Sequence, residues 1–240
     1  MLDTPPAACE ALPAAIADYA QAFRTGETAK IAARVQPSTV VYAMESGEVV
    51  GQTRAAWKAA PALPAPDLET AVVSQGPRTA IVTARWTRGG EARRDYALWA
   101  RLECRWRIVG RVVGPDRPLE GDAAEGVRAA VDLKLRSDAG WDSGTLVQAI
   151  EPRALVITLD DDQLVAASVA DWQARYVVRA RTHYPSQQAV VSRAEEGRGA
   201  LGAATWTFRS AAGATYADRA VLLRTAQGWR MLTLLWVREN

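Results

Sequence analysis

Residues 40–57 read VVYAMESGEVVGQTRAAW, and residues 155–172 read LVITLDDDQLVAASVADW. The two stretches align without a gap, each with an apolar start, an acidic turn and a closing tryptophan. Pro37 and Pro152 precede them at the same spacing and extend the match. A segment that recurs at one offset, here 115 residues, indicates that the chain contains two similar structural units.

The similarity between the two copies continues beyond this segment. The sequence AVVS of residues 71–74 recurs at residues 189–192, and Trp86 and Trp106 have counterparts in Trp206 and Trp229. The offset grows from 115 to 118, 120 and 123 residues, as expected when added residues fall in turns. Two copies are too few for a solenoid. The sequence therefore predicts two domains, residues 1–114 and residues 119–240, with a Pro-rich linker between them.

Composition is that of an ordinary globular protein. The 240 residues are 49% hydrophobic and 23% charged, which is enough chain for two small cores. No apolar run reaches the roughly 18 residues of a membrane span, and the first residues lack the features of a signal peptide. We therefore expect a cytoplasmic protein with no membrane partner. Cys9 and Cys104 have no counterparts in the other copy, so we expect two free thiols.

The charge pattern gives no support for a nucleic-acid partner. The formal net charge is only +2, although the basic residues are nearly all arginine. Many of these arginines fall between residues 85 and 111, in expected hairpins and beside acidic neighbours. This pattern is typical of a solvated sheet face, so we expect no nucleic acid to bind.

Each copy begins with helices and ends with strands. In the first copy, Leu12, Ile16 and Tyr19 recur at helical spacing, the run stops at Gly26, and a short second helix follows. A hairpin is expected next, and then a third helix that carries Trp57. Four further strands are expected at residues 68–76, 79–88, 91–102 and 105–113. This order predicts an α+β fold, with helices packed on a mostly antiparallel sheet.

The closing pattern of each copy resembles a known fold family. Asp95 lies in an expected strand that leads through a turn to WRIV at residues 106–109, and Asp218 leads similarly to GWRML at residues 228–232. With the element order, this resembles the nuclear transport factor 2-like superfamily, and more narrowly its SnoaL-like, lumazine-binding branch. The resemblance implies two tandem cone-shaped units, each with helices on a curved sheet and an interior cavity for a ligand. It does not define an activity, because this fold hosts isomerases, dehydratases, cyclases, transport factors and binding modules.

Ketosteroid isomerase is the sharpest enzymatic comparison within that superfamily. The segment DYAQAFRTGE of residues 18–27 resembles its first helix and puts Tyr19 at the position of the oxyanion-binding tyrosine. The segment TVVYA of residues 39–43 puts Tyr42 where the isomerase has its aspartate base. A tyrosine with a pKa of about 10 is a poor base at neutral pH, so we expect no catalytic residue. Lys134 and Ile157 stand at these positions in the second copy, and we therefore expect the ligand pocket in the first copy only.

Three other motifs favour structural roles. GRGALG at residues 197–202 matches the dinucleotide-binding glycine pattern, but strand-like residues follow where that motif needs a helix, so we predict a hairpin turn. The three aspartates of residues 160–162 align with a turn of the first copy, which argues against a metal site. His183 is the only histidine, and its pairing with Asp218 is a weak alternative. We expect neither a metal nor a cofactor.

Tryptophan placement and the last strand bear on how the units pack. Six of the nine tryptophans form three pairs between the copies, which favours a shared core role: Trp57 with Trp172, Trp86 with Trp206, and Trp106 with Trp229. Residues 228–237 are apolar on both faces of the expected strand. Such a face needs covering, so we expect intramolecular pairing of the two domains, with a homo-oligomer as the alternative.

The function that these observations favour is the binding of an apolar small molecule in an aromatic pocket, without catalysis. The pocket residues predicted in the first copy are Tyr19, Phe23, Tyr42, Trp57 and Trp86. Two alternatives stay open. One is an enzyme of the isomerase or dehydratase type, which uses Tyr19 with Asp18 or Asp95, and the other is a structural or protein-interaction module.

Overall fold

A computed structural model describes residues 9–45, 48–55, 64–118, 121–160, 163–182, 189–210 and 213–239. The first half contains two described helices and six strands: α1 (Leu12–Thr25), α2 (Thr28–Arg34), β1 (Val40–Glu45), β2 (Glu48–Thr53), β3 (Glu69–Gln75), β4 (Thr79–Arg88), β5 (Glu91–Leu102) and β6 (Arg105–Pro115). The second half repeats the order: α4 (Ala123–Gly140), α5 (Ser143–Ala149), β7 (Ile150–Asp160), β8 (Gln163–Ser168), α6 (Val169–Arg181), β9 (Ala189–Arg198), β10 (Leu201–Arg209), β11 (Thr215–Thr225) and β12 (Gly228–Glu239).

The two halves have the same sheet topology. The strand orders are β2-β1-β6-β5-β4-β3 and β8-β7-β12-β11-β10-β9. In each sheet one pair is parallel, β1 with β6 and β7 with β12, and the other described pairs are antiparallel. The predicted α+β fold, with helices on a mostly antiparallel sheet in each of two tandem units, is therefore confirmed.

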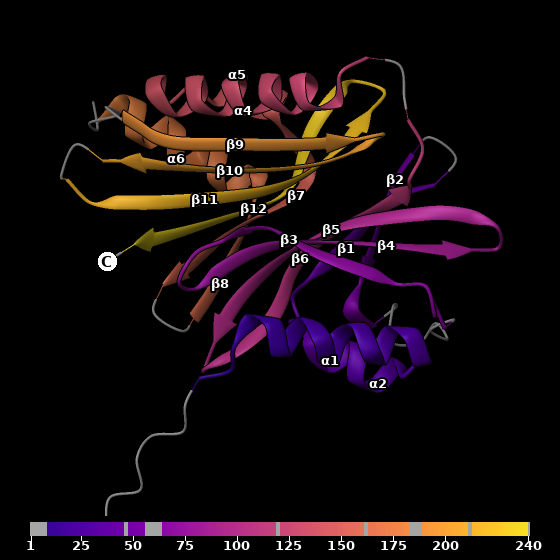
Figure 1. Cartoon of the computed structure of the whole chain (residues 1–240). Coiled ribbons are helices and arrows are strands. Elements are labelled where there is room, and N and C mark those ends of the chain that lie inside the picture. The colour runs from indigo at the N-terminus through magenta and orange to yellow at the C-terminus, as the bar shows by residue number, and fades with distance from the viewer. Residues whose placement is uncertain are drawn as a thin grey trace, which may run out of the picture.

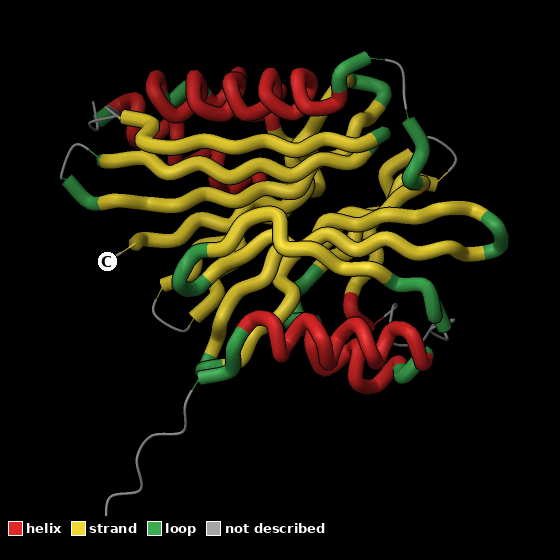
Figure 2. Tube along the Cα trace, viewed as in Figure 1, coloured by secondary structure: helices red, strands yellow, loops and turns green. Residues whose placement is uncertain are grey.

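The two sheets pack face to face, and the helices cover their outer sides (Figures 1 and 2). Period-two alternation divides each strand between these two environments. On β5, Tyr96 and Leu98 face the other half, whereas Ala97 and Trp99 face the helices of their own half. The inter-sheet core draws from both halves and includes Leu201, Leu223 and Leu235 of the second. The chain therefore has two helix-facing cores and one core that the halves share.

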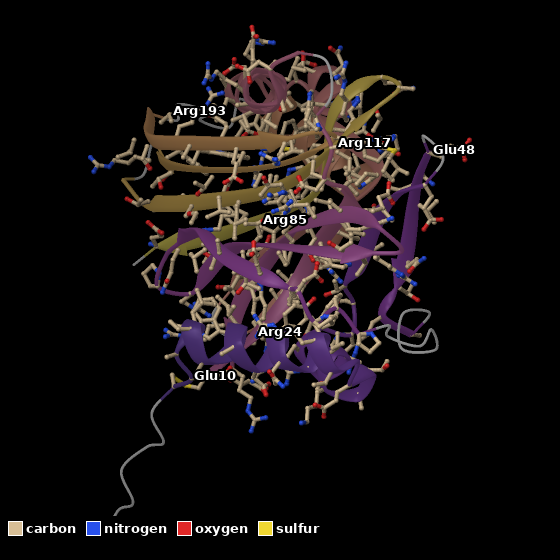
Figure 3. The ribbon with its side chains drawn as sticks, turned by 45° about the vertical axis from the view of Figure 1, so that its right-hand side comes forward. Glu10, Arg24, Glu48, Arg85, Arg117 and Arg193 are labelled. Carbon is tan, nitrogen blue, oxygen red and sulfur yellow. A yellow bond between two sulfur atoms is a disulfide. The ribbon has the colours of Figure 1, made fainter. Side chains whose placement is uncertain are left out.

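Asp116, in the segment that joins the halves, connects them electrostatically. Its carboxylate contacts Arg85 at 2.9 Å, Arg94 at 3.1 Å and, from the second half, Arg198 at 2.8 Å. Figure 3 shows Arg85 in the region where the halves meet. Burial alone would raise the pKa of Asp116, but Arg94 and Arg198 more than offset this and lower it. The linker thus takes part in a charge network that spans both halves.

Cys9 and Cys104 form a disulfide, so the expectation of two free thiols is wrong. The chain before α1 lies against the turn between β5 and β6, where the Glu10 N–H donates to the Cys104 carbonyl at 2.9 Å. Trp106 adds two hydrogen bonds, from its backbone N–H to the Glu10 carboxylate and from its indole to the Glu10 carbonyl. Figure 3 marks Glu10 beside the start of α1. The cytoplasmic location stays a prediction. The disulfide does not favour it, because disulfides persist mainly in oxidising compartments.

Several local predictions have clear outcomes. Gly26 ends α1 in the left-handed conformation, with φ of 71°. Gly199 lies in the tight turn between β9 and β10, which confirms a hairpin in place of a dinucleotide-binding loop. The third helix predicted around Trp57, as well as His183, lies outside the described residues. None of the described helices has the length and apolar character of a membrane span.

Candidate interior sites

The first-half interior brings together three of the five predicted pocket residues. Tyr19 and Phe23 lie one turn apart on α1, with ring centroids 5.8 Å apart, and Phe23 meets Trp86 of β4 edge-on at 5.5 Å. Trp99 of β5 packs at right angles to Tyr19 at 5.6 Å. The Tyr19 hydroxyl is buried and has no hydrogen-bond partner among the described residues. Burial raises the pKa of this hydroxyl above its ordinary value, so it is a donor at any physiological pH.

An ion pair lies beneath these rings. Arg111 of β6 donates from Nε to the Asp95 carboxylate of β5 at 2.6 Å, and its Nη2 contacts the same oxygen. The other Asp95 oxygen accepts the Ala84 N–H at 3.0 Å. The Arg111 guanidinium lies 5.5 Å from the centre of the Phe23 ring. Burial raises the pKa of Asp95, and Arg111 opposes that rise. Both oxygens of the carboxylate are therefore occupied.

Tyr42, another predicted pocket residue, lies elsewhere. Tyr42 faces the inter-sheet core, where its hydroxyl donates to the Arg153 carbonyl of the second half at 2.6 Å. It is separated from Tyr19 by the sheet itself, because alternate residues of β1 face opposite sides. Trp57 lies outside the described residues. Asp18, one of the acids considered for the enzymatic alternative, is exposed on α1 and pairs with Arg34 at 2.8 Å.

The second-half interior contains a buried polar cluster that sequence reasoning missed. Lys134 and Asp138 lie one turn apart on α4, and the Lys134 ammonium is 2.6 Å from both carboxylate oxygens. The Tyr176 hydroxyl of α6 donates to Asp138 and lies 3.5 Å from the Lys134 nitrogen. Trp141 packs edge-on against Tyr176 at 5.2 Å. Lys134 and Asp138 are only 3% and 4% exposed, so this is an interior cluster.

Asp218 lies on the helix-facing side of β11, in the same interior. It pairs in register with Trp206 of β10 and with Trp236 of β12. Burial raises the pKa of Asp218 to about 8, Lys134 opposes this rise, and Asp138 adds to it. The carboxyl is therefore mostly protonated at neutral pH. Its Oδ1 atom has no hydrogen-bond partner within the described part of the chain, and neither does the indole N–H of Trp206.

The alignment of the two copies shows which substitutions make the two interiors different. Asp218 is the counterpart of Asp95, but the position of Arg111 is taken by Leu234. The cation lies on the helix instead, because Lys134 replaces Tyr19, and the next turn carries Asp138 in place of Phe23. The sequence did contain a signal for this cluster. It was a lysine and an aspartate four residues apart on the apolar face of an amphipathic helix. The expectation of a ligand pocket in the first copy only left this signal unused.

Two pockets on the surface lie away from both interiors. One of about 320 Å³ is lined by residues of α1, α2 and β6, including Arg34 and Arg107. The other, of about 160 Å³, opens between the halves beside Ile81 and Thr205. In the ranges that the structure describes, no three His, Cys, Asp or Glu side chains are grouped to hold a metal ion.

Comparisons with known proteins bear on the fold. No protein-family profile matches this sequence, and no curated protein does. Among solved structures, an NTF2-like protein of unknown function from Shewanella baltica OS155 is 14% identical, with a TM-score of 0.42, and covers 48% of this chain and 93% of its own. An NTF2-like protein of unknown function from Silicibacter pomeroyi DSS-3 is 22% identical, with a TM-score of 0.37. The match covers 44% of this chain and 92% of that protein. A candidate ketosteroid isomerase from Parabacteroides distasonis ATCC 8503 is 10% identical, with a TM-score of 0.37. The match covers 46% of this chain and 85% of that protein.

Each of these proteins corresponds to about half of this chain. Both halves have the helix-and-sheet arrangement that the resemblance to the nuclear transport factor 2-like superfamily implies. At these identities the comparison concerns the fold alone.

Proposed function

We propose that this protein binds a small, largely apolar molecule inside its first half, without catalysing its conversion. The observation that carries the proposal is the Tyr19 hydroxyl, which is buried among aromatic rings and has no partner within the described residues. A buried polar group without a hydrogen bond is costly, and an acceptor on a bound molecule would offset that cost. Phe23 and Trp86 supply flat apolar walls beside it.

The enzymatic alternative needs a free base near Tyr19, and the first half offers none among its described residues. Asp95 is the interior carboxylate that this alternative would use as the base. Arg111 and the Ala84 N–H already occupy both of its oxygens. A base engaged by a guanidinium is weakened, because proton uptake would break that ion pair. Binding without chemistry therefore fits this geometry best.

The interaction-module alternative, which includes a homo-oligomer, depends on exposed apolar residues at the sheet edges. Val72 of edge strand β3 is 45% exposed, and Val191 of edge strand β9 is 59% exposed. Exposed edges of this kind can pair with another chain. A failure of every tested compound to bind in the first-half interior would favour this alternative.

The test is a titration with flat apolar compounds that carry one oxygen acceptor, including steroid ketones, followed by tryptophan emission. Burial of about 300 Å² of apolar surface contributes up to about 7 kcal/mol before association costs, so the expected Kd is micromolar to millimolar. Tyr19→Phe should weaken binding about tenfold through the lost hydrogen bond. Trp86→Phe should reduce the amplitude of the emission change.

Tyr42→Phe is the matched control, because it removes the same atom from a tyrosine that faces the other half. It should leave the affinity unchanged. Equal weakening by Tyr42→Phe and Tyr19→Phe, or saturable binding that neither Tyr19→Phe nor Trp86→Phe alters, would contradict the proposed site.

A further inference from the structure

The Cys9–Cys104 disulfide lies at the surface, at the end of the first half where α1 begins. Both cysteines are exposed, and the chain contains no others. Glu10 (Figure 3), which directly follows Cys9, and Arg105, which directly follows Cys104, both line the surface pocket of about 320 Å³. We propose that this disulfide is a thiol-exchange site, at which a small anionic thiol held by Arg105 and Arg107 reduces the bond reversibly. The site lies outside both interiors and does not depend on the function proposed for the first half.

The pocket beside the disulfide is lined mainly by charged side chains. Its volume falls at the lower end of the range for small-molecule sites, roughly 300–1,000 Å³. The charged lining residues are four cations and two acids: Lys30, Arg34, Arg105, Arg107, Glu10 and Asp18. They come from the chain before α1, from α1 and α2, and from β6. The walls therefore include both of the segments that the disulfide joins.

Two of the four cations are already paired with carboxylates. Arg34 contacts Glu10 at 2.7 Å and Asp18 at 2.8 Å. Lys30 contacts Glu27, the residue before α2, at 2.7 Å. The side of the pocket that α1 and α2 form therefore carries no excess of positive charge, and the excess lies on β6.

Arg105 and Arg107 carry that charge. Arg107 donates to the Ala33 carbonyl at 3.0 Å, and neither arginine contacts a carboxylate within the described ranges. Because they are two residues apart on β6, their side chains leave the same face of the strand. Two guanidinium groups on one face suit an oxyanion such as a carboxylate or a sulfonate. Glu103, in the turn beside Cys104, opposes an anion in part.

The turn that carries Cys104 is strained. Glu103 and Cys104 join β5 to β6 in the left-handed conformation, with φ of 47° and 61°. Two-residue turns with positive φ favour asparagine and glycine, because other residues rarely adopt this conformation. Turn geometry therefore does not account for a cysteine at this position. Disulfides that are exposed or held in strained segments are the ones that exchange most readily with thiols.

Exchange at this bond consumes two equivalents of thiol. The first thiolate attacks one cysteine sulfur and forms a mixed disulfide with it, and the other cysteine leaves as a thiolate. A second thiolate attacks the mixed disulfide, which frees the remaining cysteine and releases the two small molecules joined as their own disulfide. The chain thus gains two electrons and two protons, and the two thiols lose them. The reverse reaction with the same small disulfide restores the Cys9–Cys104 bond.

Reduction would free the start of α1. This helix has no side-chain N-cap, whereas the Asp122 carboxylate caps α4. The chain before α1 is held instead by the disulfide and by Glu10, which bonds to Arg34, Trp106 and Cys104. A helix end without a cap leaves several backbone N–H groups without partners and frays when its tether breaks. Exchange would therefore control the order of the first turns of α1.

The experiment compares three two-carbon thiols of different charge on the full oxidised chain. 2-Mercaptoethanesulfonate carries a sulfonate anion, 2-mercaptoethanol is neutral, and cysteamine is a cation. Alkylation and mass spectrometry follow the reaction, and because the chain has only two cysteines, every labelled thiol comes from this bond. Rate constants are expressed per thiolate and corrected for basicity with a Brønsted slope of about 0.4–0.5. The sulfonate should react at least about tenfold faster than cysteamine, and high salt should reduce this ratio.

Three variants assign the charge preference to this pocket. Arg105→Gln removes one cation and should lower the ratio about three- to fivefold. Glu103→Gln removes the opposing acid and should raise it. Arg136→Gln, the matched control, removes an exposed arginine of α4 and should leave the ratio unchanged. A ratio near one in the unsubstituted chain, or equal losses in Arg105→Gln and Arg136→Gln, would overturn the inference.

Hydrogen exchange measured by mass spectrometry tests the consequence for α1. In the reduced chain the amides of residues 15–19 should exchange faster, and those of residues 126–130 in α4 should not change. The double variant Cys9→Ser and Cys104→Ser should show the same pattern without any thiol. Unchanged exchange in α1, or unfolding of both halves on reduction, would mean that the bond is a structural clamp and not a reversible exchange site.

Discussion

Two buried arginines differ in whether a carboxylate reaches them. Arg111 pairs with Asp95 inside the first half and is 3% exposed. Arg219 lies at the inter-sheet side of β11 and is 4% exposed, but its Nε and Nη1 atoms have no hydrogen-bond partner within the described ranges. Burial lowers the pKa of Arg219, and Glu239 and Asp218 oppose this only in part. The same residue type is therefore stabilising at one site and costly at the other.

This contrast predicts that replacing the two arginines changes the free energy of unfolding in opposite directions. Arg111→Met leaves the Asp95 carboxylate buried without its cation and should lower the free energy of unfolding by about 3 kcal/mol. Arg219→Met removes a desolvated charge and keeps much of the side-chain volume, so it should raise that free energy by about 1–3 kcal/mol. Urea titrations at pH 7 measure both. Destabilisation by Arg219→Met as large as that by Arg111→Met would show that Arg219 is paired in solution.

Residue positions were predictable where the pattern of a single element fixes them, and not where two elements meet. Tyr19 and Phe23 follow from helical spacing. The side of the sheet that Tyr42 faces depends on strand register, and a shift of one residue reverses it. Pairing of Cys9 with Cys104 depends on how the chain before α1 crosses the β5–β6 turn, for which the second copy offers no parallel. The cluster at Lys134 depends on Tyr176 of α6 reaching Asp138 of α4.

At the level of elements, the strands were the most predictable part of the fold. Residues 79–88 and 91–102 were expected as strands and are β4 and β5 with the same bounds. Their β-branched and aromatic content and their flanking glycines fix both type and length locally. The distribution of their faces between two cores was less visible, because both faces are apolar when a sheet is covered on both sides.

The two sheets approach each other closely where β6 meets β12. A methyl group added at Gly110 of β6 would meet three atoms of the Thr233 side chain of β12 at 2.6, 2.7 and 2.8 Å. Gly110→Ala should therefore destabilise the protein by about 1–3 kcal/mol through overpacking. Thr233→Gly added to it should recover part of that loss, with a coupling of about 0.5–3 kcal/mol.

Gly140→Ala is the control for this cycle. Gly140 is the last residue of α4, and nothing lies within 4 Å of the position that an added methyl group would take. This substitution should be neutral or stabilise by up to about 1 kcal/mol. Thermal and urea unfolding measure Gly110→Ala, the single variant Thr233→Gly, the double variant and Gly140→Ala. A strictly additive double variant would mean that the sheets are not in contact at this point.

For the whole molecule, the shared core predicts what happens when the halves are separated. A fragment of residues 119–240 would expose Leu201, Leu223 and Leu235, which pack against the first half in the complete chain. We expect this fragment to self-associate, because an uncovered apolar sheet face seeks another surface. Light scattering after size exclusion gives its mass. Leu235→Glu should reduce the association, and a monomeric unsubstituted fragment would argue against the shared core as a source of stability.

The contact between Gly110 and Thr233 has a consequence for how such a protein can change over time. Trp229 follows Trp106 by 123 residues, and Thr233 follows Gly110 by the same number, so these two residues occupy equivalent positions in the two copies. In a symmetric dimer of identical chains, a residue on the axis meets its own copy, and two threonines would collide where two glycines would leave a gap. A single chain escapes this constraint because each copy mutates alone. A chain with two copies can therefore carry a different residue at each of two equivalent positions, here glycine and threonine.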